Sequence, residues 1–252
     1  MNRLLYAVHK WISAAAFVQL AIWTVSGFVF ATVSQASIRS APAEGAHKGV
    51  ITAAPAVSLA RALEVASLAS GAVSRVDLRA TPSGLYYVVQ GEEATVRIDA
   101  REGTLAPVTA AEAAAIASRD QPGSPAAQAT TLVASSPPIE YRDCESGECP
   151  LPVFRVALAD VAGTVVYVDA ATGDVTARRN DRWRTYDFFW SLHIMDYRGR
   201  EDFNHWLIRA AALLAMSTVA SGMVLLAIRA ARWVRRRGRA PCAAKASTSP
   251  RG

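Results

Sequence analysis

The chain has 252 residues, of which 52% are hydrophobic and only 19% are charged, a balance more apolar than that of an ordinary soluble domain. The formal net charge of +6 does not indicate a nucleic-acid-binding protein, because ten of the 27 basic residues lie outside residues 11–228. Within that range 17 basic residues face all 21 acidic residues, a net charge of about −4. The composition excludes a basic nucleic-acid surface there and directs attention to membrane segments.

Two uninterrupted apolar runs predict two membrane-spanning helices. Residues 11–33, "WISAAAFVQLAIWTVSGFVFATV", carry no charge, and residues 206–228, "WLIRAAALLAMSTVASGMVLLAI", carry only Arg209, near the start. At about 1.5 Å per helical residue, each run is long enough to cross a hydrocarbon layer of about 30 Å. The lipid bilayer is therefore the first expected partner of this chain.

Basic residues outside the two runs predict their orientation. Arg3 and Lys10 precede the first run, and six arginines lie between residues 229 and 239. By the positive-inside rule, residues 1–10 and 229–252 are expected in the cytoplasm and residues 34–205 in the periplasm of a bacterial inner membrane. The arginine tail is interpreted as a stop-transfer anchor beside anionic lipid rather than as a binding patch. A cleaved signal peptide is the alternative for the first run, but its apolar core exceeds the usual length of about 7–15 residues.

The cysteines agree with this topology. Cys144 and Cys149 lie in "CESGECP", between the runs, where an oxidising compartment would let them form a small disulfide loop. A metal site there lacks further ligands nearby. Cys242 lies in the basic tail and is expected to be a free thiol.

The segment between the runs contains an internal repeat. "VRIDAREGTLAPVT" from Val96 and "VYVDAATGDVTARR" from Val166 share a Val-x-x-Asp-Ala-x-x-Gly frame, typical of a strand, a tight turn at glycine and a further strand. Helical patterns precede both, and the second begins at Thr109 with a capping box, "TAAE".

We therefore predict an α+β fold in which a helix followed by an antiparallel β-meander occurs twice, over residues 56–108 and 109–182. Residues 34–55, which include a solvated His47, are expected to form a polar linker, and residues 121–152 an irregular insertion. Residues 183–205 form a juxtamembrane segment rich in aromatic residues and histidine.

These features carry a family resemblance. The repeated helix and meander, the "HKW" before the first run and the "LH" before the last one resemble PepSY-domain proteins with PepSY-associated transmembrane helices. Larger members of that family have four spans and resemble ferric or ferric-siderophore reductases that hold b-type haem. By this resemblance His9 and His193 are expected to be axial ligands of haem b.

The residues themselves leave both histidine roles open. His9, beside Lys10 and Trp11, equally suits an ordinary interfacial belt. His193 would project from an aromatic face of a helix over residues 186–197, a face that either walls a flat apolar cofactor or merely lies at the interface. The proposed pocket wall consists of Tyr186, Phe189 and Trp190, with Tyr197 on the same face and Asp187 and Ser191 on the other.

His205 is a possible substitute or second ligand. A continuous helix would place it about 18 Å from His193, but a break in "DYRGRED", at Gly199, could bring the two closer. His205 equally suits an interface residue at the start of the helix.

Because His9 lies about 30 Å in depth from the other two histidines, a bis-histidine haem on its side requires a homodimer that forms a four-helix bundle. The polar and small residues expected in its helix contacts are Ser217, Thr218, Ser221, Gly222, Gln19, Thr24, Ser26 and Gly27.

Two functions are consistent with the sequence. The first is an electron-transfer protein with haem b, a candidate haem-dependent ferric reductase, which reduces ferric iron or a ferric chelate in the periplasm. The second is a membrane-anchored interaction or regulatory module without a cofactor. Phosphate-binding loops, nucleotide fingerprints and zinc-protease motifs are absent from the sequence.

Overall fold

The structure is a computed structural model that describes residues 2–38, 42, 51, 53–145 and 147–237. It divides into two compact units, one of Met1–Ala31 with Phe189–Gly252 and one of Thr32–Phe188. Most of the predicted linker, including His47, lies outside the described residues, as do Cys242 and the tail after Arg237.

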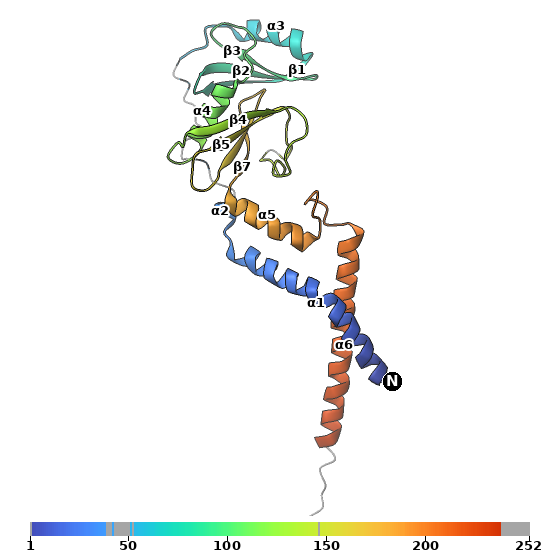
Figure 1. Ribbon diagram of the computed structural model, residues 1–252. Helices are drawn as coiled ribbons and strands as arrows, with labels where there is room; N and C mark the ends of the chain where they lie inside the picture. The colour runs from blue at the N-terminus through green and yellow to red at the C-terminus, as the bar shows by residue number, and fades with distance from the viewer. Residues whose placement is uncertain (1, 39–41, 43–50, 52, 146, 238–252) are drawn as a thin grey trace, which may run out of the picture. The chain divides into compact units, whose positions relative to one another are not determined.

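The first unit contains two long helices, α1 (Asn2–Thr32) and α6 (Trp206–Arg237), both visible in Figure 1. Both are long and apolar enough to cross a membrane. Helix α1 begins before the first predicted run and α6 continues after the second one. Neither extension, residues 2–10 or 229–237, contains glycine or proline, which would disfavour a helix. Exposed apolar side chains such as Phe17, Phe28 and Leu213 cover their outer faces, as expected for helices in lipid.

The second unit contains two antiparallel sheets, of strand order β1-β2-β3 and β4-β5-β6-β7. Helix α3 packs on the first sheet and α4 on the second. The predicted α+β class, with two apolar helices flanking a β-rich region, is therefore confirmed. The elements are α2 (Gln35–Ile38), α3 (Leu59–Ser70), β1 (Val73–Thr81), β2 (Gly84–Gly91), β3 (Thr95–Asp99), α4 (Ala110–Asp120), β4 (Ala127–Val133), β5 (Val153–Leu158), β6 (Val165–Asp169), β7 (Val175–Arg179) and α5 (Asp181–Ile194), which continues into the first unit.

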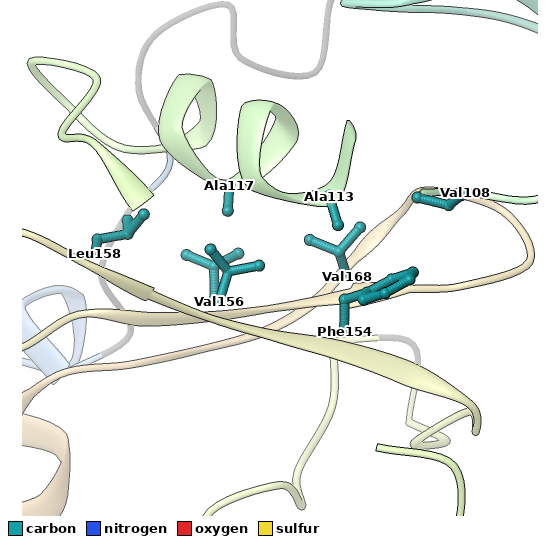
Figure 2. Packing of buried hydrophobic residues seen from close by; sticks show 8 residues of the cluster. Val108, Ala113, Ala117, Phe154, Val156, Leu158 and Val168 are labelled. Carbon is teal, nitrogen blue, oxygen red and sulfur yellow. The ribbon is translucent and has the colours of Figure 1, made fainter. Parts of the chain in front are cut away.

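Alanines allow each helix to lie close to its sheet. In Figure 2, Ala113 and Ala117 of α4 point toward Val156 and Val168 of the second sheet. Ala62 and Ala66 of α3 occupy the corresponding place over the first sheet. Because alanine has a short side chain and the strands supply branched ones, each helix packs directly on the valine side chains of its sheet.

The repeated frame forms the same turn twice. Asp99 Oδ1 accepts hydrogen bonds from the N–H groups of Arg101 and Glu102, and Asp169 Oδ1 accepts them from Ala171 and Thr172. In both turns the glycine N–H donates to the carbonyl of the aspartate, and Gly103 and Gly173 have φ of 71° and 81°. Glycine is favoured at this point because other residues rarely adopt a positive φ.

The predicted insertion over residues 121–152 is partly wrong, because Ala127–Val133 form β4, which pairs with β5. The strand was hidden in the sequence because it lies at a sheet edge and most of its side chains are exposed, so it lacks apolar alternation. Beyond it, a disulfide joins Cys144 and Cys149, and the N–H of Glu145 donates to Thr176 O on β7. The small loop is thus attached to the second sheet.

A buried ion pair connects the two repeats. Arg97 on β3 donates to both carboxylate oxygens of Glu112 on α4, at 2.9 and 2.5 Å, and the two side chains are 1% and 6% exposed. Glu112 was expected to complete the capping box. Its N–H does donate to Thr109 Oγ1, but its carboxylate is directed to Arg97 and to the hydroxyl groups of Thr81 and Ser83.

Candidate functional site

One face of α1 carries the packed residues of this helix. They recur at steps of three and four residues, the spacing of a single helical face. The residues of this face are His9, Ser13, Ala16, Gln19, Trp23, Ser26 and Phe30, all half-buried or buried. The first and the sixth of them, His9 and Ser26, take part in two histidine contacts that closely resemble each other.

His9 lies against α6 of the same chain. Its Nδ1 is 2.8 Å from Ser221 Oγ, and Ser221 Oγ donates to Thr218 O at 3.0 Å. The imidazole packs on Gly222, where an added Cβ would approach His9 Cε1 to 3.2 Å. Two small residues expected at contacts with a second copy therefore hold His9 within one chain.

His193 makes the corresponding contact near the end of α5. Its Nδ1 is 2.7 Å from Ser26 Oγ, and Ser26 Oγ donates to Ile22 O at 2.8 Å. The indole N–H of Trp23 donates to the carbonyl oxygen of His193 at 2.7 Å. Ser26 is fully buried, so the ring and the backbone of His193 are both fixed by α1.

The two contacts indicate the same tautomer. A serine hydroxyl has one proton, and donating it to a helix carbonyl leaves only lone pairs for the histidine. Both hydrogen bonds can form together only if Nδ1 carries the proton, which leaves a lone pair on Nε2. A neutral imidazole with Nδ1–H bound and Nε2 available is the usual state of a metal-ligating histidine.

The Nε2 atoms differ slightly in their surroundings. His9 Nε2 has Ser13 Oγ at 3.5 Å, the limit of a hydrogen bond, whereas His193 Nε2 has no hydrogen bond with the part of the chain that the structure describes. Burial also lowers the pKa of His193, which favours its neutral form near pH 7.

Aromatic rings surround His193. Phe30 lies edge-on to the imidazole with ring centroids 5.3 Å apart, Trp23 is at 6.3 Å, and Trp190 is 6.1 Å from Phe30. Of the predicted wall, Trp190 is in this cluster. Phe189 is half-buried one turn before His193, and Tyr186, also half-buried, belongs to the unit of residues 32–188.

Sequence reasoning missed Trp23 and Phe30. Both lie on the His9 face of α1, so the helical spacing contained a signal for them, but nothing in the sequence paired that face with α5. The side of α5 expected to be distant from the site is also buried, since Asp187 and Ser191 are 4% and 3% exposed.

The chain reverses between His193 and His205. Helix α5 ends at Ile194, three residues before its expected end, where Met195 takes a φ of 59°. The Asp196 carboxylate then accepts hydrogen bonds from four backbone N–H groups of the turn, those of Arg198, Gly199, Glu201 and Asp202. Desolvation alone would raise the pKa of Asp196, but these bonds, that of Gly199 first, hold the pKa below its usual value.

This turn returns His205 to the end of α5. His205 Nε2 lies 2.9 Å from Ile194 O, so it donates to a carbonyl that the helix leaves free. An added Cβ at Gly199 would lie 2.9 Å from Asp196 Oδ2, so a larger residue there would shift the carboxylate that accepts the hydrogen bonds of the turn. The structure thus contains the expected turn in "DYRGRED", although the helix already ends at Ile194, and it places His205 next to the residue that follows His193.

His9 and His193 remain far apart within one chain. Seventeen residues separate His9 from Ser26, the contact of His193, which corresponds to about 25 Å along α1. Among residues 2–38, 42, 51, 53–145 and 147–237, no three His, Cys, Asp or Glu side chains form a cluster that could hold a metal ion.

A family model described as PepSY-associated TM region matches residues 80–246, well over half of the chain. The chain belongs to the PepSY-associated transmembrane family. The PepSY_TM match includes His193, His205 and α6, and leaves α1 with His9 outside it. Searches of curated proteins and of solved structures found no match.

The predicted family is thus confirmed. PepSY_TM membership, together with two helices of spanning length, makes this a membrane protein whose two spans flank a β-rich region.

Proposed function

We propose that this PepSY_TM protein is a b-type haem electron-transfer protein of a bacterial inner membrane that reduces ferric iron or a ferric chelate in the periplasm. The proposal rests on one observation, the pair of histidines whose Nδ1 atoms are held by helix-bonded serines. This arrangement leaves an Nε2 lone pair on each imidazole. It suits a group that takes one nitrogen ligand from each side of an iron.

The donor chemistry fits haem, and the spacing of the histidines determines how it would be held. His193 would supply one axial nitrogen, with Phe30, Trp23 and Trp190 as apolar neighbours. His9 would supply one nitrogen ligand at its own depth in the membrane. At the depth of His9 and at that of His193, a second copy of the chain would supply the other ligand. When bound, haem supplies one-electron chemistry.

The protein's own contribution is positioning. Ser26 and Ser221 fix the tautomer and orientation of the imidazoles, and Trp23 fixes the backbone of His193. The half-buried aromatic rings near His193 would limit the access of water to a bound iron, and such shielding tunes the potential of the iron. Residues 34–205 would present the ferric substrate on the periplasmic side.

The proposal is tested on the full chain, expressed with adequate haem supply and purified in mild detergent. We expect a red protein with a Soret band and b-type bands that appear on reduction and disappear when a ferric chelate is added. Protein that stays colourless, even after haem is added back, would refute the proposal and favour the membrane-anchored interaction module.

Replacing Ser26 by alanine tests the positioning role. The variant removes the acceptor of the Nδ1–H group, so we expect the affinity for haem to fall by about 10- to 100-fold, as for other groups that orient metal ligands. The measurement is haem loss to an excess of a haem-binding competitor.

Thr185→Ala is the matched control, since the exposed Thr185 hydroxyl, on the same helix as His193, donates to the carbonyl of Asp181 one turn earlier, as Ser26 does to Ile22 O. Equal haem loss from the two variants would show that Ser26 does not orient a ligand.

A further inference from the structure

A basic hollow lies between the first turns of α1 and the last turns of α6. Its volume is about 750 Å³, and both helices contribute to its wall. Four arginines line it: Arg3 on α1 and Arg229, Arg232 and Arg236 on α6. These arginines therefore surround one shared space between two helices, whereas the arginines of an extended tail would be spread along the chain.

These charges have no acidic partner among the residues that the structure describes. None of the four guanidinium groups forms an ion pair or hydrogen bond with another residue that the structure describes. The sequence has no acidic residue before Glu44 and none after Asp202. Since arginine remains ionised at all physiological pH values, four like charges around one volume favour an anionic ligand.

The other residues that line the hollow are apolar or aromatic, which suits an amphipathic ligand. Leu225 and Ile228 line the side of the hollow that lies toward the middle of the apolar helix. Tyr6 and Trp233 lie beside the arginines, and rings of these types are favoured where hydrocarbon meets headgroups. A free phosphate would use the arginines but leave the apolar wall without a partner.

We propose that this hollow is a binding site for an anionic phospholipid, whose phosphate contacts the arginines and whose acyl chains lie along Leu225 and Ile228. Basic pockets between membrane helices favour such headgroups. Tyr6 and Leu225 are each about one turn from a residue of the contact between His9 and Ser221. The lipid therefore joins α1 to α6 next to that contact.

The experiment titrates the full chain in neutral detergent with phosphatidylglycerol or phosphatidylcholine and counts bound lipids by native mass spectrometry. We expect phosphatidylglycerol to bind selectively. The double variant Arg229→Gln/Arg232→Gln should bind it at least about 10-fold more weakly. The matched control is Arg235→Gln/Arg237→Gln, which removes the same charge from the same end of α6 but from residues that do not line the hollow.

Two results would overturn the proposal. One is equal loss of binding in the two double variants, which would indicate a nonspecific attraction to the basic tail. The other is equal competition by inorganic phosphate, which would show that the acyl chains contribute nothing. Unchanged helical circular dichroism verifies that the variants fold, and neither result depends on whether the protein binds haem.

Discussion

Replacing His193 by glycine should remove the haem held at the depth of Ser26. The Nε2 atom of His193 is the nitrogen that the hydrogen bond between Nδ1 and Ser26 leaves available, and the neighbouring rings of Phe30 and Trp23 cannot replace it. The expected result is complete loss of the haem absorption due to this site, measured as haem per chain in the purified protein. The double variant with His9→Gly should be colourless.

Added imidazole distinguishes a lost ligand from a damaged fold. The glycine variant leaves a space of the shape of the missing ring, next to a serine that still accepts a hydrogen bond. If His193 is an axial ligand, free imidazole should restore the b-type spectrum of His193→Gly. An unchanged spectrum in the variant without imidazole would remove His193 from the site.

The sequence predicted those features that depend on residues close together in the chain. Two apolar runs identified α1 and α6, and the repeated aspartate and glycine identified the turns after β3 and β6. Strand β4 was missed because its edge position gives it no apolar pattern. Glycine and charge in "DYRGRED" indicated the break before His205, although not the hydrogen bond from His205 to Ile194 O.

The serine partners of the histidines could not be predicted. Ser26 and His193 are 167 residues apart, and His9 and Ser221 are 212 apart. No local pattern relates such residues, because the contacts arise only when α1 packs against α5 and α6. Small residues on membrane helices predicted close contacts between helices. In the structure, Ser221 and Gly222 make such a contact with His9 of the same chain.

Removing Arg97 should be among the most destabilising single changes in the β-rich unit. The Arg97→Met variant leaves the Glu112 carboxylate buried with only the hydroxyl groups of Thr81 and Ser83 as donors. Loss of one partner from a buried ion pair costs about 3–5 kcal/mol. The expected loss appears in the free energy of unfolding of the full chain by urea in mild detergent, followed by the β-sheet signal in circular dichroism.

Two further variants separate the buried charge from general damage. Arg97→Met/Glu112→Met should recover most of the lost stability, because replacing both members of a buried pair by apolar residues is often nearly neutral. Arg61→Met breaks an ion pair with Glu64 whose side chains are 57% and 65% exposed, and it should cost at most about 0.5 kcal/mol. Equal losses for Arg97→Met and Arg61→Met would contradict the argument.

The same pair predicts how stability changes with pH. Desolvation alone would raise the pKa of Glu112, but hydrogen bonds from Arg97 first, and then from Ser83 and Thr81, hold it below the ordinary value. A carboxyl group whose pKa is lower in the folded state binds fewer protons there, so its stabilisation is present above its unfolded pKa, about 4.3, and is lost as the pH falls through the folded pKa. In Arg97→Met the pKa should rise and this loss should begin at a higher pH. The measurement is the pH at which acid removes half of the β-sheet signal from the wild-type protein and from Arg97→Met. If this pH is the same for both, Arg97 does not stabilise the charged form of Glu112.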